Sequence, residues 1–229
     1  LATAMQDGDV QGVIIVGGNP AFNAPSNTNL AAAIEKLPMS AHLSYYENET
    51  SKVCKWHINK AHWLESWTDG RSIDGTKCIG QPIIEPLFDG LSHAEFLAIL
   101  AGETVVDSHT IVRTTFNPKA DQMNPAWRAA VHDGVVSNTS TVEAPPVNRK
   151  IPPATISQSG GTEAIFIPSA SIWDGQFANN GWLQELPDTI TKLTWDNAAL
   201  LSPTTAEKLG VVQGDMLKVT VGGTSIEIA

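Results

Sequence analysis

A short apolar run that leads directly into a pair of glycines constrains the fold more than any other part of the chain. Val13 to Val16 are all aliphatic, and Gly17-Gly18-Asn19-Pro20 follow them. Such a run predicts a strand of a parallel sheet that is covered on both faces. Paired glycines let the backbone turn sharply and approach a ligand closely. Because open α/β sheets bind ligands at the carboxyl ends of their strands, we expect a binding loop at residues 17–20.

The residues after this loop predict a second strand parallel to the first. Asn27-Thr28-Asn29 supply N-cap residues for a helix over residues 30–37, and Pro38 ends it. Residues 41–45 then form the next expected strand. The order of strand, loop, helix and strand predicts a right-handed parallel βαβ unit.

Composition and charge exclude several classes of partner. The chain has 229 residues, of which 42% are hydrophobic, which is enough for one large or two medium domains, each with its own core. Its 24 acidic and 14 basic residues give a net charge of −10. We therefore expect neither nucleic acid nor an anionic membrane as a partner. No segment has the roughly 20 apolar residues of a membrane span, so direct membrane insertion is not expected.

The two ends of the sequence suggest a piece of a longer protein. The chain begins at Leu1 without an initiator methionine, and it stops within an alternating strand pattern over residues 224–229. An incomplete β module would expose a strand edge, so we also expect the chain to self-associate.

Two cysteines cannot by themselves form a disulfide framework or hold an iron-sulfur cluster. We expect Cys54 and Cys78 to be buried thiols, with a single disulfide between them as the alternative. Cys54, His57, His62 and Cys78 also suggest zinc, but the spacing beyond Cys54 and His57 matches no zinc motif, so no metal site is predicted.

The middle of the chain is aromatic and then helical. Residues 47–67 contain three tryptophans and two histidines, which we expect to cover a core edge or an interface. Residues 73–80 and 81–87 are expected to be short strands or loops. Helices are predicted over residues 92–100 and 125–132, because Gly102 and Gly134 follow them at the positions of C-caps.

A Pro-rich segment divides the chain in two. Pro145, Pro146, Pro152 and Pro153 predict a connector over residues 137–160, which leaves an α/β domain over 1–136. In residues 161–229 we expect strands over 163–168, 193–195 and 215–221, a short helix over 203–209, and a hairpin at Gly222-Gly223. This mostly β pattern indicates an incomplete barrel-like domain.

Three segments resemble the C-terminal half of the large subunits of molybdopterin oxidoreductases, the complex iron-sulfur molybdoenzymes. The strand that ends in Gly17-Gly18-Asn19-Pro20 is similar to the loop at the head of the family's third domain. Glu49-Thr50 followed by Trp63-Leu64-Glu65 resembles its "E-T … L-E" stretch. Residues 202–215 resemble the "P-x-x-A-x-x-L-G-I-x-x-G-D" pattern of its dinucleotide-binding barrel. The resemblance implies an α/β fold: a parallel-sheet, Rossmann-like domain followed by an incomplete double-psi-type β-barrel.

Within the family, residues 174–187 and 127–134 are most similar to the iron-sulfur subunit of the bacterial alternative complex III. That resemblance implies respiratory electron transfer with other subunits of a membrane-bound redox complex, at the periplasmic face of the bacterial cytoplasmic membrane. Iron-sulfur clusters and metal ligands would lie in regions outside this chain, so the chain alone is expected to be inactive. Since that subunit is understood to lack molybdenum, a cofactor-free structural subunit that keeps the fold is the alternative.

The resemblance also implies a binding site for molybdopterin guanine dinucleotide. The backbone of Gly17, Gly18 and Pro20 and the side chain of Asn19 would hold its pyrophosphate or guanosine, together with Glu49 and Thr50. The structural alternative is a tight turn in which Asn19 bonds its own backbone. The loop lacks the G-x-G-x-x-G pattern of nicotinamide and flavin sites.

A second group of polar residues lies among the aromatic side chains of the last domain. The amides there would be buried and need partners, which either a pterin edge or neighbouring turns could supply. The residues expected at the cofactor are Asp174, Asn179, Asn180 and Asn197. A hydrolase is not expected, because the chain has no G-x-S-x-G nucleophile elbow.

Overall fold

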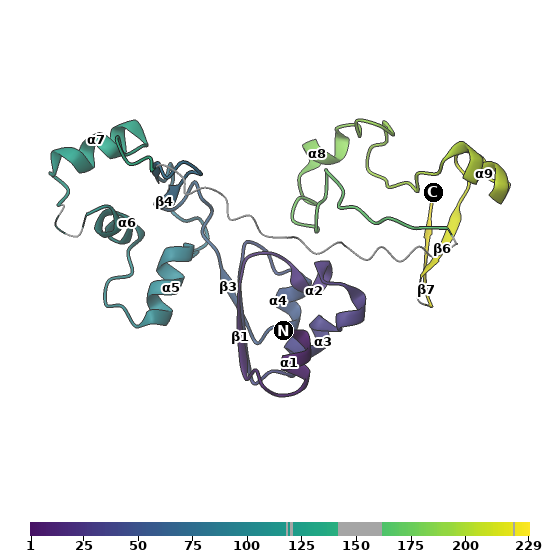
Figure 1. The fold of residues 1–229 in the computed structure, drawn as a ribbon, viewed down its shortest axis with the longest axis horizontal. Helices are drawn as coiled ribbons and strands as arrows, with labels where there is room; N and C mark the ends of the chain where they lie inside the picture. Colours follow the sequence, from purple (N-terminus) through teal and green to yellow (C-terminus); the bar gives the residue numbers. More distant parts are fainter. Residues whose placement is uncertain (118, 120, 142–161, 222) are drawn as a thin grey trace. The chain divides into compact units, whose positions relative to one another are not determined.

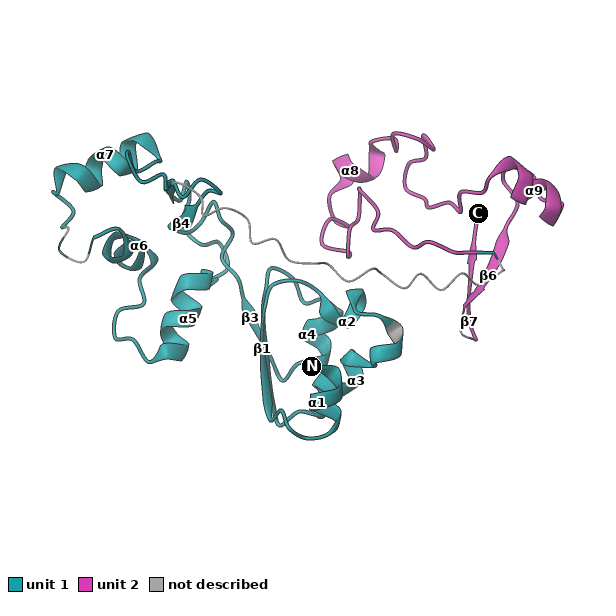
Figure 2. Ribbon diagram, viewed as in Figure 1, with its two compact units in different colours: residues 1–162 teal, residues 163–229 magenta. Residues whose placement is uncertain are grey.

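The structure, a computed structural model, describes residues 1–141 except 118 and 120, and residues 162–229 except 222. The chain divides into two compact units, residues 1–162 and 163–229 (Figure 2). Most of the predicted connector lies outside the described residues. The helices of the first unit are α1 (Ala2–Gln6), α2 (Pro20–Asn23), the 3-10 helix η1 (Ser26–Thr28), α3 (Leu30–Lys36), α4 (Glu49–Val53), α5 (His93–Ala101), α6 (Ser108–Phe116) and α7 (Pro125–Asp133).

A three-stranded parallel sheet organises the first part of this unit. Its strands are β1 (Gly12–Val16), β2 (Met39–Ser44) and β3 (Trp56–Asn59), in the order β1-β2-β3. Ile15 pairs with His42, and His42 pairs with His57. A parallel bridge from Lys60 to Leu91 continues the sheet beyond β3. The predicted βαβ unit is confirmed, since β1, α3 and β2 follow one another and the two strands are parallel.

The first strand of the sheet, β1, is covered on one face only. Val13 and Ile15 of β1 pack against a core of Met5, Ala33, Ile34 and Leu37 from α1, α3 and the residue after α3. Figure 1 shows α1 to α4 on the same side of the sheet. Ile14 and Val16, on the other face, are 38% and 40% exposed. The expectation of a first strand covered on both faces is therefore wrong, because β1 is an edge strand and helices α1 to α4 lie on a single face.

A second core lies farther along the first unit. The antiparallel strands β4 (Thr68–Arg71) and β5 (Lys77–Gly80) meet α6 and α7 around Ile79, Val112, Trp127 and Ala130. Helix α5 begins with a capping box between Ser92 and Glu95 and ends at Gly102 in the left-handed conformation. Helix α7 likewise ends before Gly134, also left-handed, as predicted.

The second unit contains α8 (Gly181–Glu185), α9 (Pro203–Leu209) and the hairpin of β6 (Leu217–Val221) and β7 (Thr224–Ile228). The predicted helix and hairpin are confirmed, although Gly222 lies outside the described residues. The strands expected over 163–168 and 193–195 are not formed. Among described residues 162–229, Gln184 is the one buried side chain, so this unit has no hydrophobic core of its own. Strands need a partner and a covered face, and neither is available to these two segments.

Candidate functional site

The loop predicted to bind a ligand lies at the carboxyl end of the parallel sheet. Gly17 and Gly18 directly follow β1 and have φ angles of +73° and +74°, a conformation that favours glycine. The Gly17 amide donates to the carbonyl of Leu43 in β2, at 2.8 Å. A Cβ added to Gly17 would lie 3.9 Å from Lys60 Nζ, and a Cβ added to Gly18 would lie 4.0 Å from Pro20 Cδ. The space beside Gly17 and Gly18, which together we call the glycine step, is therefore open.

Three of the predicted site side chains bind one another. Asn19 is 1% exposed, and its Nδ2 donates to Glu49 Oε2 at 2.7 Å. Its Oδ1 accepts from the Thr50 amide at 3.2 Å and from the Thr50 hydroxyl at 2.8 Å. The Thr50 Oγ1 accepts from the Ala21 amide at 2.9 Å. We call Asn19, Glu49 and Thr50 the polar clamp, because they tie the glycine loop to the start of α4.

The electrostatics of the polar clamp follow from these bonds. The hydrogen bond from Asn19 holds the pKa of Glu49 below its ordinary value. The helix itself is capped by Asn48, whose Oδ1 accepts from the amides of Thr50 and Ser51. Glu49 and Thr50 therefore keep the loop in place, and what the loop offers to a ligand is chiefly the glycine backbone.

Behind the loop, a chain of hydrogen bonds joins two strands and α4. His42 is fully buried, and its Nε2 lies 3.1 Å from the Gly18 carbonyl oxygen. Because a carbonyl can only accept, Nε2 carries the proton, and Nδ1 accepts from the Ser51 hydroxyl at 2.8 Å. Ser51 Oγ in turn lies 2.9 Å from His57 Nδ1. Burial lowers the pKa of His42, so this histidine is neutral and fixes the Gly18 carbonyl.

The sequence did not predict Lys60, which lies beside the glycine step, or its neighbours Tyr45 and His93. Lys60, the first residue after β3, places its Nζ 4.5 Å from the ring centroid of Tyr45. Tyr45 is the first residue after β2, and His93 begins α5. Residues that follow a strand often bind ligands, so Lys60 could have been identified if β3 had been predicted. However, Trp56-His57-Ile58-Asn59 is too short and polar to show a strand pattern.

The four polar residues predicted in the second unit behave as turn residues. Asn179, Asn180 and Asn197 are exposed rather than buried among the aromatic side chains, because this unit has no core to enclose them. The Asn180 side chain caps α8 by accepting from the Leu183 amide at 3.2 Å. Asp174 accepts from the Gln176 amide at 3.2 Å. The buried amide of this region is Gln184, which donates to the carbonyls of Ser171 and Phe177.

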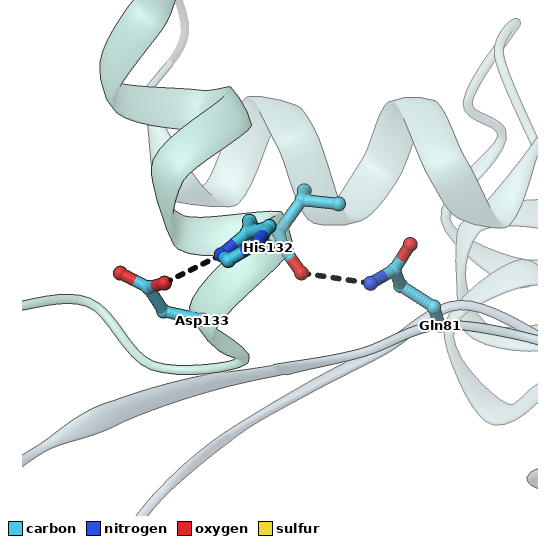
Figure 3. A network of polar contacts seen from close by, with 4 residues as sticks. Gln81, His132 and Asp133 are labelled. Atoms are coloured by element: carbon cyan, nitrogen blue, oxygen red, sulfur yellow. Dashed lines mark hydrogen bonds and ion pairs between the residues drawn. The ribbon is translucent and has the colours of Figure 1, made fainter.

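A larger hollow opens at the second core of the first unit. Its volume is about 580 Å³, and its walls include Trp67, His109 and Trp127, whose rings contact one another. Figure 3 shows one rim, where Gln81 Nε2 donates to the Val131 carbonyl at 2.7 Å. His132 and Asp133 form an exposed pair there at 2.8 Å. An exposed pair of this kind contributes little to stability or recognition.

Neither cysteine forms a disulfide, so both Cys54 and Cys78 are free thiols, each partly rather than fully buried. Burial raises the pKa of Cys54. In the described ranges, no three His, Cys, Asp or Glu side chains gather as metal ligands would. A search of the same ranges finds no helix that is both long and apolar enough to span a membrane.

Comparison with known proteins supports the fold and leaves the family open. No protein-family model and no curated protein matches the sequence. Among solved structures, acetylene hydratase from Pelobacter acetylenicus matches with a TM-score of 0.62 and 15% sequence identity. The alignment covers 99% of this chain and 36% of the hydratase, so the chain spans about a third of that protein's length. The likeness shows a distant molybdopterin-enzyme-like fold of mixed α/β type.

Proposed function

We propose that this chain forms one wall of a pterin dinucleotide site in the large subunit of a molybdopterin-type oxidoreductase. The observation that carries the proposal is the open glycine step at the carboxyl end of a parallel sheet, in a fold similar to that of a molybdopterin-type enzyme. A pterin dinucleotide carries a diphosphate and flat rings, and an open glycine backbone with a nearby lysine suits such groups. When bound, the cofactor would supply the redox chemistry.

The residues of this chain divide into those that would touch the cofactor and those that would hold the loop. The backbone of Gly17 and Gly18 would lie against the diphosphate, and the Lys60 ammonium is the nearest side-chain cation to it. The polar clamp would keep the loop in its conformation. His42 would orient the Gly18 carbonyl through its Nε2 proton. The guanine dinucleotide form, a contribution from residues 174, 179, 180 and 197, and a double-psi barrel over 161–229 are further parts of the proposal.

The cellular role belongs to the proposal as well. By its sequence resemblance, the parent protein would transfer electrons in a membrane-bound respiratory complex, with other subunits as partners, at the periplasmic face of the cytoplasmic membrane. A second candidate is a cofactor-free subunit that keeps the fold. The observation that favours this second candidate is the polar clamp itself, since Asn19, Glu49 and Thr50 already satisfy one another without a ligand.

The test is the cofactor content of the full-length protein that contains this chain. We expect stoichiometric molybdenum or tungsten by metal analysis, and a fluorescent pterin after oxidative release. Gly18→Ala should reduce both the metal and the pterin content, because the added Cβ would occupy the open space beside the glycine backbone. Gly102→Ala is the matched control, because Gly102 also has a φ of +74° and open space for a Cβ but lies at the far end of α5. Protein that contains neither metal nor pterin would overturn the proposal and favour the cofactor-free subunit.

A further inference from the structure

Beside the glycine step lies a small cavity, which shares Lys60 with the proposed cofactor site. Its volume is about 210 Å³. It opens where β2 and β3 end and where β4 and α5 begin, so it lies, like the glycine step, at the carboxyl end of the parallel strands. The side chains that matter to its chemistry are Tyr45, Lys60, Trp63, Trp67, Asp69 and His93.

Lys60 gives this cavity a positive charge without a counter-ion. Among the described residues, no carboxylate oxygen comes within 4.0 Å of its Nζ, which lies over the Tyr45 ring, 4.5 Å from the ring centroid. Lys60 is partly buried, and this burial lowers the pKa of its ammonium group. A partly desolvated cation without a partner attracts an anion more strongly than an exposed lysine does.

The acidic side chains nearby do not neutralise this charge. Glu65 is held by the backbone, since its Oε2 accepts from the His62 amide at 2.9 Å and its Oε1 from the Leu87 amide at 3.3 Å. Asp69 lies in β4 and is exposed, so it contributes a solvated negative charge to the wall. The interior near Lys60 is therefore positive, and the Asp69 side is negative.

The remaining walls are aromatic. Tyr45, Trp63 and Trp67 line the cavity, and Trp63 is 63% exposed, so its side chain is available to a ligand. His93 lies close enough to Lys60 for the lysine charge, together with burial, to lower its pKa. A neutral imidazole can donate a hydrogen bond to an oxygen atom without a second positive charge.

We propose that the cavity binds the oxyanion group, phosphate or carboxylate, of a small ligand whose flat ring lies against Trp63. The oxyanion pairs with the Lys60 ammonium and accepts a hydrogen bond from His93. The volume admits a single ring with its anionic group and excludes a large cofactor as a whole. The inference shares Lys60 with the proposed function, so its test follows the binding of a small oxyanion, which can succeed or fail whatever the cofactor content of the protein.

The experiment titrates the protein with phenyl phosphate and with inorganic phosphate at constant ionic strength, and follows tryptophan fluorescence and heat. We expect saturable binding of both, with phenyl phosphate the tighter by roughly tenfold because it adds ring contact. Lys60→Met should weaken phenyl phosphate by at least about tenfold. Lys36→Met is the matched control, because Lys36 is exposed at the end of α3, shortly before the amino end of β2.

Asp69→Asn provides an independent test at an exposed position where folding is not at risk. Removal of its charge should tighten phenyl phosphate about two- to fivefold, since like charges repel. Equal effects of Lys60→Met and Lys36→Met, or no response to Asp69→Asn, would overturn the inference.

The source of the oxyanion is determined with the cofactor-loaded protein. Unchanged phenyl phosphate binding there indicates a separate ligand, whereas blocked binding indicates a phosphate of the cofactor. Gly18→Ala should lower cofactor content but leave phenyl phosphate binding unchanged.

Discussion

Replacement of Asn19 by alanine should loosen the sheet of the first unit by breaking the polar clamp. The variant loses the hydrogen bond to the Glu49 carboxylate and both bonds from Thr50. Glu49 is exposed, so water replaces part of its bond, whereas the buried Thr50 hydroxyl loses an acceptor. At about 1 kcal/mol for each bond that water does not replace, plus the small void, we expect a loss of about 2–3 kcal/mol.

Hydrogen exchange of the β2 amides measures this loss directly. Since 1.4 kcal/mol is a factor of ten, exchange in β2 should accelerate about 30- to 150-fold, while exchange in α7 stays unchanged. Asn23→Ala is the control, because Asn23 is exposed at the end of α2 and its side chain makes no hydrogen bond to the described residues. Equal exchange rates in the two variants would refute the role of the clamp.

The same substitution should change the acid side of the stability profile. Because the pKa of Glu49 in the folded protein lies below its ordinary value of 4.5, Glu49 stabilises the fold above that value. This contribution is lost as the pH falls through the folded pKa. Without the Asn19 bond the pKa of Glu49 returns toward its ordinary value, so Asn19→Ala should show a shallower decline in stability with acid than the unmodified protein.

Four further outcomes follow from the packing. Burial lowers the pKa of His42 below 6.5, so the urea midpoint should fall as the pH drops below 6.5 and until it passes the folded pKa, and His42→Gln should flatten this decline. Trp127→Ala removes a side chain that is 3% exposed in the second core and should cost about 3–5 kcal/mol in urea unfolding. Ser92→Ala breaks the capping box and should cost about 1 kcal/mol, with faster exchange confined to α5. Lys60→Met should raise the urea midpoint, because it removes a half-buried cation that has no counter-ion.

The sequence predicted the elements whose apolar pattern and caps agree. β1, α3 and β2 follow from an apolar run, an alanine-rich helix and a proline stop, and α5 follows from Ser92, Glu95 and Gly102. β3 was not predicted, because a four-residue strand with Trp, His and Asn shows no alternation. α4 was not predicted either, since Glu49–Val53 contains weak helix formers and depends on the Asn48 cap.

The second unit shows what local pattern cannot decide. Ile165-Phe166-Ile167 have the composition of a strand, yet they are 68–78% exposed and pair with nothing among the described residues. Strand propensity is realised only against a partner strand and a covered face, and both are tertiary properties. The hairpin of β6 and β7 does form, because Val221 and Thr224 pair locally across Gly223, which has a φ of +85°.

The sequence predicted a loop at the end of the first strand, which the structure has, but it did not predict the partners of Asn19. Polar residues after a strand were expected to face a ligand, but Asn19 is turned inward to Glu49 and Thr50, which lie 30 and 31 residues away along the chain. Only the folded chain reveals that pairing. The groups left facing the open space are the glycine backbone and Lys60.

Asn19 and Lys60 bear differently on the two candidate functions. The polar clamp stabilises the loop without a ligand, which favours the cofactor-free subunit, whereas Lys60 favours a subunit that binds an anionic ligand. A partly desolvated cation without a counter-ion costs stability, and an anionic ligand is what offsets that cost. In a purely structural subunit Lys60→Met would therefore improve stability with no other consequence. In a ligand-binding subunit the same change would improve stability and weaken anion binding, so the two measurements on one variant show whether Lys60 serves a ligand.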